Sequence, residues 1–149
     1  MSQIDKKTFK RALGSFASGV TVVTVRTPDG DDHGMTANAF SSVSMDPPLI
    51  LVCIQNKNQT FDLISKAGAF AVNILARDQE ERSNRFAGGI VDAEGRWQRW
   101  PEDRSRFADL IHTRAEASGA MFLTGSLASI DCTLEAVHPG GDHGIFVGR

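Results

Sequence analysis

The first apolar pattern in the chain has the spacing of an α-helix. Four apolar residues recur at positions i, i+3, i+4 and i+7 along one face: Phe9, Ala12, Leu13 and Phe16. Asp5 is placed to cap this helix, and Gly19 is placed to end it. The pattern predicts one short amphipathic helix near the N-terminus.

Apolar and β-branched residues predict strands in most of the remaining chain. Val20–Arg26 is rich in β-branched residues, and Ala69–Leu75 is a second segment of this kind. Leu49–Gln55 is an apolar run typical of a central strand that is buried on both faces. Apolar residues alternate between Ile130 and Ala136, which predicts a half-buried strand.

Two further short helices are predicted between the strands. The first spans Phe61–Lys66, and Gly68 can close it. The second begins near Asp78 and Glu81, which have the spacing of a capping box, and ends at residue 85 or 86.

Gly88–Arg106 has no clear period. It contains both tryptophans, Trp97 and Trp100, together with a proline and many charges. We expect an irregular excursion with a turn of helix, of a length typical of a functional or interface loop.

The succession of strands and turns with few helices predicts a mainly β fold, a β-barrel with peripheral helices. A doubly wound sheet is disfavoured, because no GxGxxG motif follows a strand and no P-loop motif is present. The 149 residues fit a single domain, 1–149. Because His143–Arg149 has the pattern of a strand, we expect the natural protein to continue and the C-terminal strand to be cut short.

Composition excludes several classes of partner. The net charge is −2 without a long block of one sign, so we expect no nucleic acid partner. Met1–Lys7 is polar and no apolar segment follows it, and the longest apolar run is Leu49–Ile54, so we expect neither an export signal nor a membrane span. Cys53 and Cys132 lie in apolar strand patterns and predict buried free thiols in a cytoplasmic protein.

The segment Gly34–Ser44 (GMTANAFSSVS) is small, polar and uncharged. Its hydroxyl and amide groups and its short alanines would let a flat ligand lie close to the backbone. A polar edge strand would have the same composition, so the pattern alone leaves both interpretations open.

Other candidate chemistry is weaker. His138, Asp142 and His143 lie close together in sequence but lack the spacing of a zinc site, so we expect no metal. No GxSxG nucleophile motif is present. Asn56–Thr60 enters a helix with a lysine and a threonine, which suits a phosphate but is also the composition of an ordinary capped helix start.

Three segments together resemble one family. The segments are FKRALGSFASGVTVVT, GMTANAFSSVSMDPPLILVCI and the closing GGDHGIFVGR. They are similar to the short-chain flavin reductases, the reductase components of two-component flavin-dependent monooxygenases, and the similarity runs from about Phe9 to Arg149. The resemblance implies a split β-barrel of the FMN-binding, flavin reductase-like type, with antiparallel Greek-key strands, and a homodimer with flavin near the subunit interface.

The resemblance also implies site residues. The segment that lines the flavin ring and ribityl chain corresponds to Thr36, Ala37, Asn38, Ala39, Ser41, Ser42 and Val43. Lys57, Gln59 and Thr60 fall where the family contacts the flavin phosphate. Arg85 and Phe86 match a segment beside the flavin, and His143 matches a histidine near the nicotinamide.

The activity implied is that of an NAD(P)H:flavin oxidoreductase. It would bind FMN or FAD without a covalent link, take a hydride from NADH or NADPH, and pass reduced flavin to a partner oxygenase. Because the cofactor carries the chemistry, the absence of a catalytic dyad is no objection. A flavin-binding redox sensor or store, and an FMN-dependent amine oxidase of the related barrels, remain as alternatives.

Overall fold

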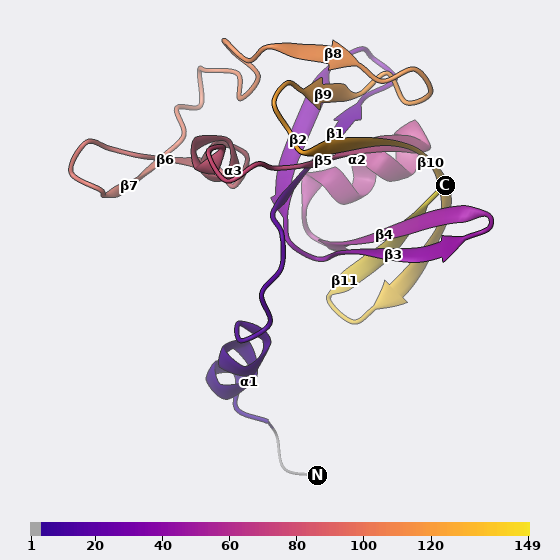
Figure 1. Ribbon diagram of the computed structural model, residues 1–149, viewed down its shortest axis with the longest axis horizontal. Helices are drawn as coiled ribbons and strands as arrows, with labels where there is room; N and C mark the ends of the chain where they lie inside the picture. Colours follow the sequence, from indigo (N-terminus) through magenta and orange to yellow (C-terminus); the bar gives the residue numbers. More distant parts are fainter. Residues whose placement is uncertain (1–3) are drawn as a thin grey trace.

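The computed structural model describes residues 4–149, and a seven-stranded sheet forms its centre (Figure 1). The strands of this sheet are β1 (Thr21–Arg26), β2 (Asp32–Ala37), β3 (Phe40–Met45), β4 (Pro48–Gln55), β5 (Ala69–Ile74), β10 (Ala128–Gly140) and β11 (His143–Gly148). Two small sheets contain β6 (Gly89–Val91) with β7 (Trp97–Arg99), and β8 (His112–Arg114) with β9 (Met121–Leu123). The helices are α1 (Lys6–Leu13), α2 (Gln59–Ala67) and α3 (Glu80–Phe86).

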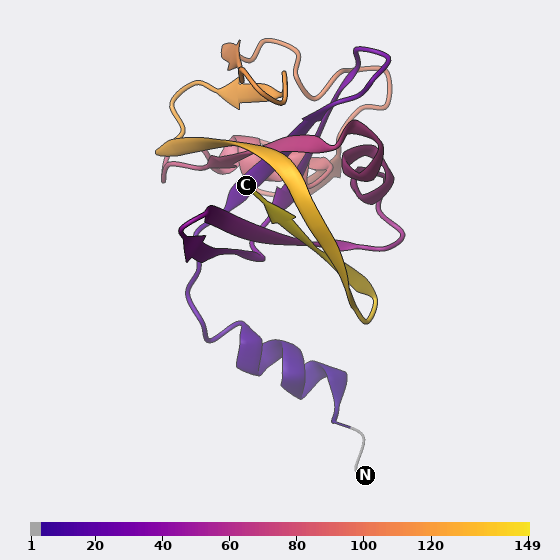
Figure 2. The same ribbon diagram turned by 90° about the vertical axis from the view of Figure 1, so that its right-hand side faces the viewer.

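The central sheet has the order β2-β1-β5-β10-β11-β4-β3, and every neighbouring pair is antiparallel. The long strand β10 pairs with β5 through its first half and with β11 through its second half. The register shifts between Leu134 and Ala136, where a bulge lets the strand bend (Figure 2). The sheet therefore curls, and the expected split β-barrel is confirmed.

The two edge strands, β2 and β3, follow each other directly in the chain. Asn38 and Ala39 form the corner between them, and the Cys53 amide of β4 donates to the Ala39 carbonyl oxygen over 3.0 Å. The sequence pattern predicted one polar segment over Gly34–Ser44, whereas the chain turns in its middle. This turn brings small side chains to the open edge of the barrel.

The barrel is filled by aliphatic and aromatic side chains that are fully buried, among them Val23, Val52, Ile54, Phe70, Val72 and Phe146. Helix α2 contributes Ile64 to the same core. Asn58 caps α2, and Gly68 closes it in the left-handed conformation at φ 68°, as predicted.

A buried asparagine joins several strands. The Asn73 side chain on β5 is fully buried and donates to the carbonyl oxygens of Val22 and Met121, each over 3.2 Å. Its carbonyl oxygen accepts from the Leu123 amide and from the Ser129 hydroxyl, both over 2.8 Å. This one side chain therefore connects β1, β9 and β10 to β5.

Two sequence predictions are wrong in detail. On β4 only Val52 and Ile54 are fully buried; Cys53 is half-buried, because its face of the strand borders a cavity. Helix α3 begins after Gln79, and no side chain caps it, so Asp78 is not its capping residue. The second cysteine, Cys132, is a buried free thiol as expected, and burial, with the nearby charge of Asp131, raises its pKa to about 11.

The excursion contains a β-hairpin, β6–β7, and not a turn of helix. The Asp92 carboxylate accepts from the amides of Glu94 and Arg96 and shapes the tip. Trp100 is only 5% exposed, and its ring packs against the guanidinium groups of Arg85 and Arg104. Those contacts hold in place a segment whose apolar residues follow neither a helix nor a strand period.

Helix α1 projects away from the barrel, and none of its residues is buried (Figure 2). The Asp5 carboxylate accepts from the Thr8 amide over 2.9 Å, which confirms the predicted cap. The helix ends at Leu13, earlier than the predicted Gly19, because the next amides bond three residues back: Ser15 to Ala12 and Phe16 to Leu13. Within residues 4–149, no helix combines the length and the apolar character that crossing a membrane requires.

Candidate functional site

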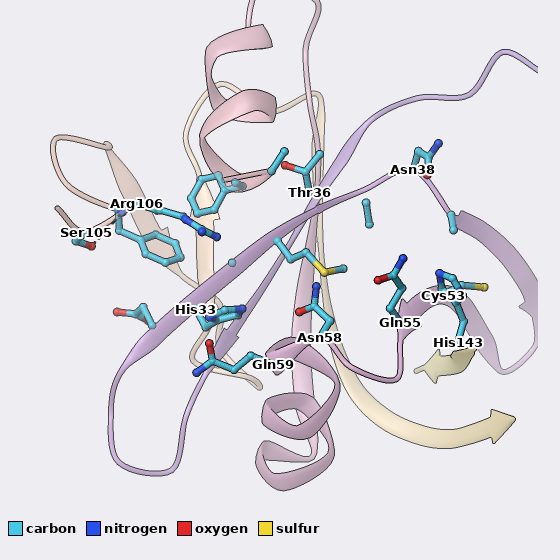
Figure 3. A pocket seen from close by; sticks show the side chains of 18 residues that line it. His33, Thr36, Asn38, Cys53, Gln55, Asn58, Gln59, Ser105, Arg106 and His143 are labelled. Carbon is cyan, nitrogen blue, oxygen red and sulfur yellow. Dashed lines mark hydrogen bonds between the residues drawn. The ribbon is translucent and has the colours of Figure 1, made fainter. Parts of the chain in front are cut away.

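A cavity of about 830 Å³ lies at the open edge of the barrel, where β2 turns into β3. Strand β2 and the corner form one wall, and β4, the start of α2, the end of α3, the excursion and β11 supply the rest (Figure 3). Its size is within the range of small-molecule sites.

The wall formed by β2 depends on Gly34. A Cβ atom at this position would lie 2.6 Å from the Phe86 ring, so only glycine lets α3 pack this closely. The Thr36 hydroxyl donates to the Ser83 carbonyl oxygen over 2.6 Å and fastens α3 to the same strand. The small, polar composition of this segment therefore serves the packing of α3 as well as the cavity.

His33 lies on the same strand and lines the cavity. Its Nε2 atom is 2.8 Å from the Thr60 hydroxyl oxygen at the start of α2. Burial lowers the pKa of His33, and the positive charge of Arg106 lowers it further. The imidazole is therefore neutral at neutral pH. Arg106 is then the positively charged side chain that lines the cavity beside His33.

The excursion closes one side of the cavity. The Phe107 ring packs against the Phe86 ring at 5.0 Å between centroids, and Ser105 and Arg106 line the cavity beside it. Figure 3 shows the Arg106 side chain reaching over the same side as His33 and Gln59.

His143 lies at the opposite side of the cavity, near Cys53 and Gln55 (Figure 3). It pairs with Gln55 in the β4–β11 register. Its Nδ1 atom is 2.7 Å from a carboxylate oxygen of Asp142, and this hydrogen bond lowers the pKa of Asp142. Within residues 4–149, the other ring nitrogen of His143 makes no hydrogen bond.

The structure brings together about half of the predicted site residues. Those that line the cavity are Thr36, Ala37, Asn38, Ala39, Gln59, Phe86 and His143. Those outside the lining are Ser41, Ser42, Val43, Lys57, Thr60 and Arg85. The first three are on β3, beyond the corner; Lys57 is exposed in the loop before α2.

Thr60 and Arg85 act behind the cavity wall. Thr60 is fully buried, and its hydroxyl meets His33. Arg85 is 8% exposed, forms an ion pair with Glu81 at 2.7 Å and donates to the Ala108 carbonyl oxygen over 2.9 Å. It fixes the excursion against α3.

Several lining residues were not predicted individually as site residues: Asp32, His33, Met35, Cys53, Gln55, Asn58, Ser105, Arg106 and Phe107. Of these, Met35 and Asn58 lie within the candidate segments Gly34–Ser44 and Asn56–Thr60. Asp32 and His33 lie just before the candidate segment Gly34–Ser44 in the sequence, although they begin β2. For Ser105–Phe107 the sequence carries no local signal, since long-range packing places the excursion.

The lining suits a flat, polar heterocycle. Short side chains along the corner leave the backbone accessible, and the amide side chains of Asn38, Gln55, Asn58 and Gln59 offer donors and acceptors. Within the part of the chain that the structure describes, no group of three metal-ligating side chains gathers.

The fold and the site together define the class of this protein. It is an antiparallel split barrel with a cavity at the turn between its two edge strands. Residues 13–149 match the family model described as "Flavin reductase like domain". The chain belongs to this family, and the resemblance of its sequence segments is confirmed.

Named relatives are similar along most of the chain. An NADH-dependent flavin reductase from a Rhodococcus species is 44% identical over 142 residues, which cover 94% of this chain and 72% of the relative. The reductase subunit of a flavin-dependent monooxygenase from Rhodococcus jostii is 37% identical, covering 98% of this chain and 67% of the relative. An NADH:FAD oxidoreductase of Streptomyces globisporus, solved with NAD and FAD fragments, superposes with a TM-score of 0.82 at 32% identity and covers 100% of this chain and 83% of its own.

Proposed function

We propose that this protein is an NAD(P)H:flavin oxidoreductase that binds FMN or FAD without a covalent link and supplies reduced flavin to a partner monooxygenase. The observation that carries the proposal is the cavity at the β2–β3 corner, built largely from the segment Gly34–Ser44, which lies within the range that matches the family model. A bound flavin would supply the hydride acceptor for NADH or NADPH, and the residues that line the cavity would hold it in position and set the polarity around it. The relatives named above support the activity.

The lining residues fit a flavin. Ala37 and Ala39 are short enough for a ring to approach the backbone, and Asn38 offers an amide to its polar edge. Arg106 and the start of α2 lie where a phosphate would gain charge-assisted hydrogen bonds. Backbone amides near the ring would stabilise the negative charge of reduced flavin.

The residues have different proposed roles. We place Thr36, Ala37, Asn38 and Ala39 against the ring, with Ser41, Ser42 and Val43 continuing along β3. Gln59 and the flexible side chain of Lys57 face the phosphate, and Thr60 positions His33 beneath it. Arg85 and Phe86 form the wall behind, and His143 meets the nicotinamide.

Lys57→Ala should weaken FMN binding by about 1–3 kcal/mol and riboflavin binding much less, because the lost contact is charge-assisted and riboflavin has no phosphate. Fluorescence titration with both ligands measures this. Lys66→Ala, in the last turn of α2, is the matched control and should change neither affinity. Equal weakening of both ligands would show that Lys57 does not contact the phosphate.

His143→Ala should raise the KM for NADH or slow hydride transfer by about tenfold, equivalent to roughly 1.4 kcal/mol, while flavin affinity stays near that of the wild type. Stopped-flow reduction and flavin titration separate the two effects. His138→Ala, on β10 and outside the cavity lining, should behave as the wild type. Loss of flavin binding in His143→Ala would show that the role assigned to this histidine is wrong.

Anaerobic reduction of FMN or FAD by NADH tests the activity against its alternatives. A redox sensor or flavin store would bind flavin without turnover. An amine oxidase would instead consume a pyridoxamine-type amine and release hydrogen peroxide. Added oxygenase should then use the reduced flavin, as the name of the Rhodococcus jostii relative implies for that protein.

We also propose a cytoplasmic location, because both cysteines are free thiols.

We further propose a homodimer, in which a second copy covers the apolar face of α1. Phe9, Leu13 and Phe16 are 51%, 58% and 81% exposed, and Trp97 is 54% exposed, although Trp100, also expected at the surface, is buried. Light scattering at micromolar concentration should give twice the chain mass. Phe16→Asp should shift the protein toward the monomer and Lys7→Glu should not; a wild-type monomer would contradict the proposal.

A further inference from the structure

One wall of the cavity is formed by a segment without regular structure. Residues 100–111, between β7 and β8, contain neither helix nor strand. Three of them line the cavity: Ser105, Arg106 and Phe107. Within residues 4–149, the backbone hydrogen bonds that join this segment to the rest of the chain lie at its two ends, at Trp100 and Ile111. The position of its middle therefore depends on side chains.

Trp100 holds this segment from a position behind the wall. Its side chain is buried and does not belong to the cavity lining. The Cζ atom of Arg85 lies 4.6 Å from the ring centroid, and that of Arg104 lies 5.2 Å from it. The indole N–H donates to the Arg104 carbonyl oxygen over 2.8 Å. Because a cation is attracted to the face of a tryptophan ring, the ring restrains both guanidinium groups.

The Arg85 guanidinium connects Trp100 to the cavity wall. It forms an ion pair with Glu81 on α3 at 2.7 Å and donates to the Ala108 carbonyl oxygen over 2.9 Å. Ala108 directly follows Phe107, whose side chain lines the cavity. The Trp100 ring therefore restrains the one guanidinium that ties the middle of the segment to α3.

The Arg106 side chain depends on this support. Within residues 4–149, its guanidinium makes no hydrogen bond and no ion pair, whereas its backbone carbonyl oxygen accepts from Arg85 at 3.5 Å. Its charge lowers the pKa of His33, and both side chains line the same side of the cavity (Figure 3). The direction of the Arg106 guanidinium therefore follows from the backbone that carries it.

We propose that Trp100 is a positioning residue of the flavin site, which holds Arg85 and thereby keeps Arg106 directed at the flavin phosphate. The proposal rests on the reductase function proposed above. A phosphate gains charge-assisted hydrogen bonds from a guanidinium only when that group is correctly directed. Loss of the Trp100 ring should therefore weaken a phosphorylated flavin and affect riboflavin much less. The nicotinamide, which we place at His143 on the opposite side of the cavity, should not be affected.

Trp100→Leu should weaken FMN binding about tenfold, equivalent to roughly 1.4 kcal/mol, and riboflavin binding by less than about threefold. Fluorescence titration with both ligands measures this without turnover. In steady-state reduction the KM for FMN should rise by about the same factor, while the KM for NADH and kcat at saturating FMN stay near the wild type. Trp100→Phe keeps an aromatic ring for the two guanidinium groups and should restore most of the FMN affinity. Arg99→Ala, the matched control, removes only an exposed ion pair with Glu102 and should change neither affinity.

Arg104→Ala decides the matter if Trp100→Leu does not fold. This side chain is 47% exposed, and the backbone carbonyl that accepts from the indole is retained. Because the ring loses one of its two guanidinium contacts, FMN should weaken about threefold and riboflavin should not. Unchanged FMN affinity in the folded Trp100→Leu protein or, if that variant is unfolded, in Arg104→Ala would overturn the proposal, as would equal weakening of FMN and riboflavin. A selective loss of FMN affinity in a protein whose wild type reduces no flavin would contradict the reductase function alone.

Discussion

Replacing Asn73 with leucine should lower the free energy of unfolding by about 2–4 kcal/mol. The side chain is fully buried and makes hydrogen bonds to three strands beyond its own. Leucine has a similar size, so the loss comes from buried groups left without partners, above all the Leu123 amide, and not from an empty space. The total stability of a domain is about 5–15 kcal/mol, so this change is a large part of it.

Urea unfolding, monitored by circular dichroism, measures the change in the urea concentration at the midpoint of unfolding. Asn84→Ala is the matched control: this asparagine lies on α3, is only partly buried, and makes no side-chain hydrogen bond within residues 4–149. We expect it to stay within about 0.5 kcal/mol of the wild type. An unchanged midpoint for Asn73→Leu would mean that the network does not stabilise the fold.

Replacing Ala39 with tryptophan should weaken flavin binding at least a hundredfold, equivalent to about 2.7 kcal/mol. Ala39 is exposed at the β2–β3 corner and lines the cavity, so a large side chain there would occupy the space that we assign to the flavin ring. Its backbone carbonyl, which accepts from Cys53, is retained, and the barrel should remain folded.

Equilibrium titration with FMN and FAD checks this expectation, with unfolding midpoints as the test of integrity. Ala117→Trp adds the same side chain at an exposed turn outside the cavity lining and should leave both affinities unchanged. If Ala39→Trp binds flavin as tightly as the wild type, the flavin lies elsewhere.

Local sequence patterns predicted most strands and the class of fold, because alternation and turn residues act over short distances. The order of the strands was not accessible in this way. It depends on the bend of β10 between Leu134 and Ala136, where one strand passes from β5 to β11. Alternation signals burial of a face, but it does not tell which neighbour covers it.

The candidate site was predictable where it consists of one continuous segment. Thr36–Ala39, which the resemblance places against the flavin ring, lies at the cavity, but the following serines are on β3 and outside its lining. Arg106 was missed, because its position depends on contacts far apart in sequence, such as that of Arg85 with Trp100. Likewise, the environment of His33 follows from the approach of α2 to β2 and not from neighbouring residues.

The most direct test of the account is anaerobic mixing of NADH with the wild-type protein and with Ala39→Trp, each with FAD present at equal concentration. The wild type should reduce the flavin, seen as loss of the oxidised absorbance band, at a rate that saturates with FAD. Ala39→Trp, folded and at the same concentration, should reduce it at least a hundredfold more slowly below saturation. Equal rates for the two proteins, or no reduction by the wild type, would contradict the assignment of this cavity as a flavin reductase site.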